Sequence, residues 1–102
     1  MQSPLAEKLK LLPDSPGVYR FYDSEGKLLY IGKAKVLKNR VRSYFNSAAL
    51  VDPRTESWVP LIADVQWMLV GTETEALILE EQLIKKHRPK FNIDLKDDKT
   101  YP

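Results

Sequence analysis

The segment LLYIGKAKVLKNRVRSYF, Leu28–Phe45, decides how this chain folds. It opens with aliphatic and aromatic residues that favour a β-strand. From about Val36 onward the apolar residues change to helical spacing, which predicts a helix with one apolar stripe. The residues of that stripe are Leu37, Val41, Tyr44 and Phe45. Five cations and no acid lie within the segment: Lys33, Lys35, Lys38, Arg40 and Arg42. We therefore expect a strand that leads directly into a cationic helix.

The residues before this segment predict a β-hairpin. VYRFY, Val18–Tyr22, has strand composition, DSEG (23–26) supplies turn residues, and KLLYIG (27–32) forms the returning strand. A four-residue loop would place Tyr19 directly opposite Tyr30, with both hydroxyls and Lys33 on one face of the sheet. A three-residue loop would place the two tyrosines on opposite faces. The alternative interpretation is that the tyrosines pack as ordinary cross-strand aromatics.

The remaining elements complete one small domain over residues 1–102. We expect a first helix in SPLAEKLKLL with Ser3 as its N-cap, a third strand over 63–70, and an extended piece over 90–95. Thr72 and Glu75 form a capping box that begins a helix ending near His87. Residues 46–60 show no clear period and are expected to be irregular. The predicted class is α/β (α+β), a small antiparallel sheet led by a hairpin and packed by helices.

Composition and charge narrow the possible functions. The chain has 102 residues, 43% hydrophobic and 29% charged, with no cysteine and a net charge of +2. These values are typical of a single globular domain and exclude disulfides and thiolate metal sites. No apolar run is long enough for a membrane span and no secretory signal opens the chain, so we expect a cytoplasmic monomer.

The cations are clustered rather than spread along the chain. Six basic residues and no acid lie between Glu25 and Asp52, and a second cluster, KKHRPK, spans 85–90. Such clustering is typical of a surface that binds phosphates. The alternative is two lysine-rich faces exposed to solvent. Lys35 and Arg42 lie away from the apolar stripe, where they would be solvated or contact backbone phosphates.

One acidic residue is placed where a structural role does not explain it. The helix after Thr72 has an apolar stripe, and Glu80 projects close to the middle of that stripe. The stripe comprises Ala76, Leu77, Leu79, Leu83 and Ile84. A carboxylate in such a position is costly unless it is paired or binds a metal. Glu80 is therefore either in a salt bridge or at an open end of the stripe, or it is a ligand for a hard divalent cation such as Mg²⁺.

The small number of histidines and the absence of cysteine argue against other metal and catalytic sites. His87 is the one histidine, and it lies two helical turns, about 10 Å, from Glu80. The two side chains cannot share a metal without distortion, so His87 is expected to cap the helix or interact with its dipole. With one histidine and no cysteine, a zinc site or a serine or cysteine hydrolase is disfavoured.

PGVYRFY followed by LLYIGKAKVLKNRVRSYF resembles the GIY-YIG nuclease family, with GVY at 17–19 and YIG at 30–32. EALILEEQLIKKHRPKFNI and LKDDKTYP are similar to the UvrC branch of that family, and the resemblance covers residues 11–102. It implies a metal-dependent DNA endonuclease domain that makes the 3′ incision in bacterial nucleotide excision repair. The alternative is a nucleic-acid-binding module of the same fold without activity.

The resemblance also implies roles for single residues. Glu80 matches the metal ligand, with Mg²⁺ as the expected cofactor and Mn²⁺ able to replace it. The residues that match the catalytic positions are Tyr19, Tyr30, Lys33, Arg40, Tyr44 and Asn92. Arg40 would stabilise the phosphorus centre and Asn92 would hold the site together. We prefer Tyr19 as the general base that activates water, because nearby cations would lower its pKa. Lys35, Lys38 and Arg42 are predicted to bind DNA.

The resemblance extends to partners and domain organisation. Relatives continue into a UvrB-contacting segment, a second nuclease domain and DNA-binding hairpins. We therefore expect this chain to be one domain of a longer protein. UvrB and the UvrA-initiated complex would be reached through parts that lie outside it, and the domain alone would bind DNA weakly.

Overall fold

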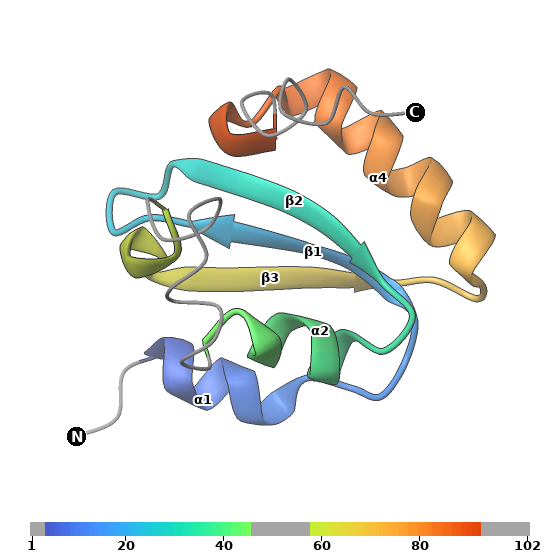
Figure 1. The fold of residues 1–102 in the computed structure, drawn as a ribbon, viewed down its shortest axis with the longest axis horizontal. Helices are drawn as coiled ribbons and strands as arrows, with labels where there is room; N and C mark the ends of the chain where they lie inside the picture. The colour runs from blue at the N-terminus through green and yellow to red at the C-terminus, as the bar shows by residue number, and fades with distance from the viewer. Residues whose placement is uncertain (1–3, 46–57, 93–102) are drawn as a thin grey trace.

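The fold is a three-stranded antiparallel sheet packed by helices, as predicted, and the helices lie on both of its faces (Figure 1). The computed structural model describes residues 4–45 and 58–92. In these ranges the elements follow in the order α1 (Pro4–Leu11), β1 (Gly17–Tyr22), β2 (Leu28–Ala34), α2 (Leu37–Ser43), the 3-10 helix η1 (Val59–Leu61), β3 (Asp64–Leu69) and α4 (Glu73–His87). The strand order is β2-β1-β3, so β2, which carries the YIG residues, is an edge strand of the described sheet.

The boundaries differ from the predicted ones in a few places. β2 begins one residue later than predicted and runs two residues further, so Lys33 lies within the strand rather than after it. The extended piece predicted over 90–95 is wrong for residues 90–92, which form a helical turn. Ser3 and most of the segment predicted to be irregular, residues 46–60, lie outside the described residues. The end of that segment forms the first part of η1.

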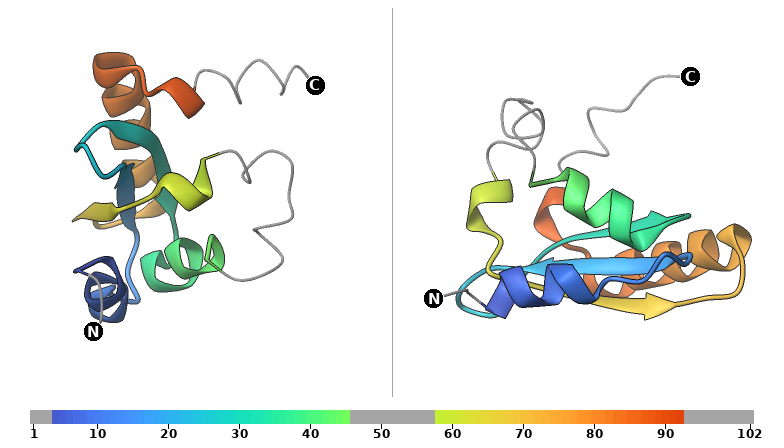
Figure 2. Two further views of the ribbon diagram at one scale, coloured as in Figure 1. Left: turned by 90° about the vertical axis from the view of Figure 1, so that its left-hand side faces the viewer. Right: turned by 90° about the horizontal axis from the view of Figure 1, so that it is seen from below.

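The two faces of the sheet bury two separate apolar clusters. Figure 2 shows α2 and α4 on opposite sides of the strands. On one face, α2 contributes Leu37, Val41 and Tyr44 to the larger cluster, which α1 and η1 complete. On the other face, Ala76 of α4 packs against Val18 and Ile31. Because alternate residues of a strand point to opposite faces, β1 supplies both clusters and is the most deeply buried strand.

The hairpin register differs from the predicted one. Tyr19 lies opposite Gly32, and Tyr30 lies opposite Phe21. Asp23 and Lys27 are joined by a backbone hydrogen bond of 2.9 Å, which leaves a three-residue loop, and Gly26 has a φ of 81°. That loop alone would separate the tyrosines, but β2 contains a bulge in which Leu29 has no partner. The extra residue reverses the alternation, and Tyr19 and Tyr30 return to one face.

The stripe of α4 is largely as predicted. Leu79, Leu83 and Ile84 pack with Ala76 on the sheet, whereas Leu77 is 43% exposed and was wrongly included. Glu80 is half-buried, in contrast to its exposed neighbour Glu81. The helix begins at the predicted cap, where Thr72 Oγ1 accepts a hydrogen bond from the backbone N–H of Glu75 at 3.1 Å. The side chain of Glu75 in turn accepts from Gly71 N at 2.9 Å.

Candidate active site

Three tyrosines from three different segments meet on the α2 face of the sheet. Tyr19 comes from β1, Tyr30 from β2 and Tyr44 from the end of α2, and all three belong to or pack against the same cluster. The ring centroids of Tyr19 and Tyr30 lie 6.4 Å apart, and those of Tyr30 and Tyr44 lie 6.3 Å apart. The hydroxyls of Tyr19 and Tyr44 are hydrogen-bonded at 2.8 Å. The sequence prediction that the two motif tyrosines share a face is confirmed, although their direct pairing is wrong.

Tyr19 is placed too deep to contact a water molecule freely. Its side chain is 1% exposed. Burial raises the pKa of the Tyr19 hydroxyl well above its ordinary value, the neighbouring Tyr44 and Tyr30 raise it further, and Arg40 lowers it by a smaller amount. The sequence shows the cations near Tyr19 but not how deeply the side chain is buried, and burial has the largest effect on its pKa. Burial therefore opposes ionisation of Tyr19, whose hydroxyl is hydrogen-bonded to that of Tyr44, and its role as the general base stays a prediction.

Tyr30 is the more accessible of the two motif tyrosines. It is half-buried, and its ring stacks on the ring of Trp58 with centroids 4.8 Å apart. Burial is the largest cause that raises the pKa of Tyr30, followed by the charges of Tyr44 and Glu80. The effect of Glu80 is informative for the geometry, because it means that the carboxylate on α4 lies within electrostatic reach of the Tyr30 hydroxyl.

Arg40, in the last turn of α2, brings a positive charge to the tyrosines. Its guanidinium carbon lies 5.4 Å from the centroid of the Tyr44 ring, the i, i+4 pair expected from the helical spacing. The charges of Tyr19 and Tyr44 both raise the pKa of Arg40, while desolvation lowers it. The guanidinium is therefore charged at all relevant pH values.

Glu80 on α4 is the candidate metal ligand beside this cluster. The described residues contain no group of three or more histidine, cysteine, aspartate or glutamate side chains that could hold a metal ion. That excludes, within those residues, a cage made wholly of protein ligands. A single half-buried carboxylate fits Mg²⁺, which takes one or two protein carboxylates and completes its shell with water and substrate oxygen. The residues present thus fit a hard divalent cation at Glu80.

Asn92 fixes the edge of β2 next to Tyr30. Its side-chain oxygen accepts a hydrogen bond from Ile31 N at 2.6 Å, and its side-chain nitrogen donates to Ile31 O at 2.8 Å. Both polar backbone groups of an edge-strand residue are satisfied by one amide, as a paired strand would satisfy them. Asn92 therefore sets the position of the strand that carries Tyr30, in agreement with the supporting role expected for it.

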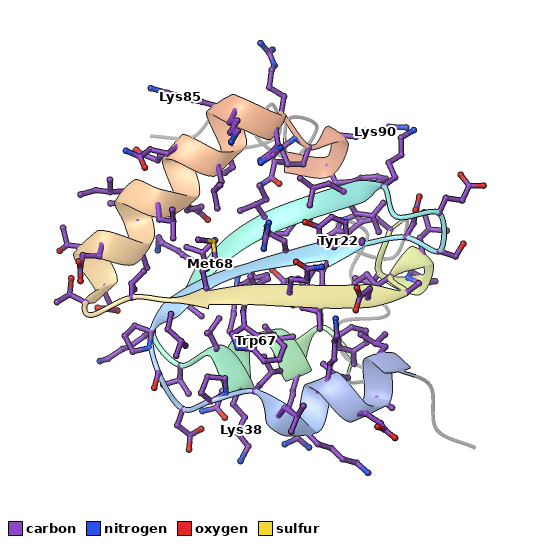
Figure 3. The ribbon with its side chains drawn as sticks, turned by 180° about the vertical axis from the view of Figure 1, so that it is seen from behind. Tyr22, Lys38, Trp67, Met68, Lys85 and Lys90 are labelled. Carbon is purple, nitrogen blue, oxygen red and sulfur yellow. The ribbon has the colours of Figure 1, made fainter. Side chains whose placement is uncertain are left out.

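The predicted phosphate-binding cations do not all lie together. A shallow hollow of about 500 Å³ is lined by Lys33, Lys35 and Arg40, among others. Lys33 lies opposite Val18 in the register, so its side chain starts on the α4 face and not on the tyrosine face as predicted. Lys38 and Arg42 are not among the residues that line this hollow, and Figure 3 shows Lys38 pointing away from the sheet beside α1.

Sequence reasoning missed two aromatic residues of the site. Trp58 is fully buried and contacts Tyr30, Tyr44 and Phe21, and the ring of Phe91 stacks on it at 5.9 Å. Trp58 lies within residues 46–60, which show no hydrophobic period, so no local pattern indicated its burial. Asn92 was identified, but nothing in KFN (90–92) indicated that the half-buried ring of Phe91 packs on Trp58.

Comparisons with known proteins agree with this geometry. The family model of the UvrC-like GIY-YIG domain matches residues 15–93. UvrABC system protein C of Desulfitobacterium hafniense (strain Y51) is 57% identical over 98 residues, which is 96% of this chain and 16% of that protein. UvrABC system protein C of Acetivibrio thermocellus is 56% identical over 98 residues, which is again 96% of this chain and 16% of that protein. This chain thus spans about one sixth of the length of these relatives.

Solved structures show the same architecture. The N-terminal GIY-YIG endonuclease domain of UvrC from Thermotoga maritima, bound to magnesium as its catalytic divalent cation, superposes with a TM-score of 0.75 at 41% identity. The match covers 89% of this chain and 98% of that one. A fold shared at this identity, together with a family model that matches most of the chain, leaves no ambiguity about kinship. This chain belongs to the UvrC-like GIY-YIG domain family.

Proposed function

We propose that this chain is a divalent-metal-dependent DNA endonuclease domain that hydrolyses a phosphodiester bond. The observation that carries the proposal is the placement of Glu80 on α4 within electrostatic reach of Tyr30, beside the Arg40–Tyr44 pair. A carboxylate for a cation, a guanidinium and several hydroxyls are the groups that phosphodiester hydrolysis requires. The magnesium-bound relative from Thermotoga maritima supports this assignment.

Glu80 is the residue that would hold the cation. Mg²⁺ is the expected ion, Mn²⁺ would replace it, and the bound ion would act as a Lewis acid that neutralises charge on the departing 3′ oxygen. A variant of the Thermotoga domain with one tyrosine replaced by phenylalanine is also bound to its catalytic cation. That observation supports a site in which at least one tyrosine hydroxyl is dispensable for metal binding.

The other side chains would handle the phosphate and the attacking water. Arg40 would bind the non-bridging oxygens and stabilise the charge that develops on them. We assign the water to Tyr30, because its half-buried side chain is more accessible than the buried side chain of Tyr19. Tyr44 and Tyr19 would keep the Tyr30 ring and Arg40 in place through their mutual hydrogen bond. Lys33 would contact the phosphate from the edge of β2.

The same assignment places the domain in a larger system. The relatives are components of the UvrABC system. We infer that the natural substrate is damaged bacterial DNA, that the domain makes the incision 3′ to a lesion, and that UvrB is contacted by other parts of a longer protein. A single nuclease domain over residues 1–102, monomeric and cytoplasmic, fits this role. Within the described residues, no helix is long and apolar enough to cross a membrane.

The test compares Glu80→Gln with Glu81→Gln. Both changes remove one negative charge from α4, but Glu80 is half-buried beside Tyr30 and Glu81 is exposed. We expect Glu80→Gln to lower Mg²⁺-dependent cleavage on the order of 10³-fold, with an unchanged circular dichroism spectrum and DNA affinity, and Glu81→Gln to cut normally. If Glu80→Gln cuts at the normal rate, the metal assignment fails. If neither the parent protein nor Glu81→Gln cuts with any divalent cation while DNA binding persists, the chain is a binding module.

A further inference from the structure

A cleft with cations at its rim opens at the start of β2. Its volume is about 490 Å³, within the range of pockets that hold small ligands. Three cationic side chains line it: Lys27 at the end of the hairpin loop, and Arg88 and Lys90 after α4. Its apolar lining includes Leu28, Leu61 and Phe91. Leu61 is 51% exposed, so an apolar surface is available to a ligand between the cations.

The cleft lies on the same strand as the site described above. Leu28 and Leu29 line it, and Tyr30 follows directly along β2. Two residues of a strand span about 7 Å. On the other side of the cleft, Phe91 precedes Asn92, which holds Ile31. The hollow lined by Lys33, Lys35 and Arg40 lies toward the opposite end of β2. Two cation-lined depressions thus flank Tyr30 along one strand edge.

Arg88 has a backbone conformation that its residue type does not favour. It follows α4 with φ 47° and ψ 60°, and it is the one non-glycine residue with positive φ among the described residues. Glycine is the usual residue at this position of a helix end, because other side chains are strained there. Strained residues concentrate at functional sites. The strained residue Arg88 is also one of the residues that line the cleft.

The one carboxylate in the lining is already engaged. Asp23 Oδ1 accepts hydrogen bonds from the backbone N–H groups of Glu25 at 2.8 Å and Lys27 at 2.9 Å, and so closes the hairpin loop. Among the described residues, the salt bridge is between Lys8 and Asp64, away from the cleft, and Asp23 does not pair with the cations of the cleft. The cleft therefore has a net positive charge that suits an anion.

We propose that this cleft is a subsite for the DNA strand next to the bond that is cut. Lys27, Arg88 and Lys90 would bind the phosphate of a neighbouring nucleotide, and Leu28, Leu61 and Phe91 would contact its sugar or base. Cations combined with an apolar surface are typical of sites that hold a single strand. The inference rests on the proposed function, because the strand is placed relative to Tyr30. It also divides the cluster over 85–90: Arg88 and Lys90 line the cleft, and Lys85 does not.

Lys90→Ala and Lys85→Ala form a matched pair. Both are exposed lysines near the end of α4, and Figure 3 shows Lys90 extending over the start of β2 while Lys85 points the other way. The probe is a fluorescent single strand of about 12 nucleotides, bound at low salt without added divalent cation. We expect Lys90→Ala to weaken affinity about 3- to 10-fold and to lower the salt slope by about 0.7. Lys85→Ala should change affinity less than about twofold.

Arg88→Gly distinguishes a loss of strand binding from a loss of fold stability. Glycine relieves the strained helix end, so the melting temperature should rise by about 2 to 5 °C while strand affinity falls. A variant that is more stable and binds more weakly cannot be explained by unfolding. Arg88→Gly with unchanged affinity, or equal effects of Lys90→Ala and Lys85→Ala, would refute the subsite. Either result leaves the Glu80→Gln comparison intact, so the two proposals fail separately.

Discussion

Gly32 shows how one residue sets the geometry of the tyrosines. It lies opposite Tyr19, and a Cβ atom at this position would overlap the hydroxyl and Cζ of the Tyr19 ring and lie 2.9 Å from Cε1. Glycine is needed here for space and not for an unusual backbone angle. The glycine of YIG therefore allows the Tyr19 ring to lie across β2, where its hydroxyl reaches Tyr44.

Gly32→Ala should displace that ring. We expect the free energy of unfolding to fall by about 3 kcal/mol, since the neighbour is a buried aromatic ring that cannot move freely. Chemical denaturation measures this loss. The double variant Tyr19→Phe/Gly32→Ala removes the hydroxyl contact, so its loss should be smaller than the sum of the two single losses. Strictly additive losses would show that the two residues are not in contact.

At this scale the sequence predicted which residues meet but not how deep they lie. Glu80 was found because an acid on an apolar stripe needs an explanation, and the motif tyrosines because they share a hairpin. The Tyr19 ring is covered in part by Tyr44 at the end of α2, which is distant in sequence. A role that depends on pKa could not be assigned without that contact, so the choice of Tyr19 as the base stays a prediction.

The register of the β1–β2 hairpin could not be predicted from the alternation of residues. Turn residues indicated where β1 ends and β2 begins, but the three-residue loop and the bulge at Leu29 are not visible in the alternation. Each feature alone would place Tyr30 on the wrong face, and together they restore it. The predicted partner of Tyr19 was Tyr30 and the observed partner is Gly32. Because these two residues are two positions apart on β2, they lie on the same face, so the face was predicted correctly from an incorrect register.

The N-terminus of α4 was predicted closely because its signal is local. Thr72→Ala removes the hydrogen bond to Glu75 N and should lower the free energy of unfolding by about 1 kcal/mol. Thr74→Ala is the control, since Thr74 is an exposed threonine two residues further along the chain. Thermal or urea unfolding of both variants provides the measurement. Equal losses would mean that the cap contributes nothing beyond helix propensity.

For the whole molecule, the site is an assembly around one edge strand. Helix α2 brings Arg40 and Tyr44 to one face of the sheet, α4 brings Glu80 from the other side, and Asn92 fixes β2 between them. The fold class and the helices were predictable from periodicity. Periodicity could not predict that residues from both faces of the sheet meet at the edge of β2, because that depends on the strand order β2-β1-β3.

Locating the ion in a crystal tests whether Glu80 holds the cation beside the tyrosine cluster. Crystals soaked in Mn²⁺ should show one anomalous scattering peak at the Glu80 carboxylate, with Glu80 as the sole protein ligand and water completing the shell. Crystals of Glu80→Gln under the same soak should lack that peak, and those of Glu81→Gln should keep it. A peak elsewhere, or a Glu80 carboxylate that stays in a salt bridge in the presence of Mn²⁺, would contradict the account.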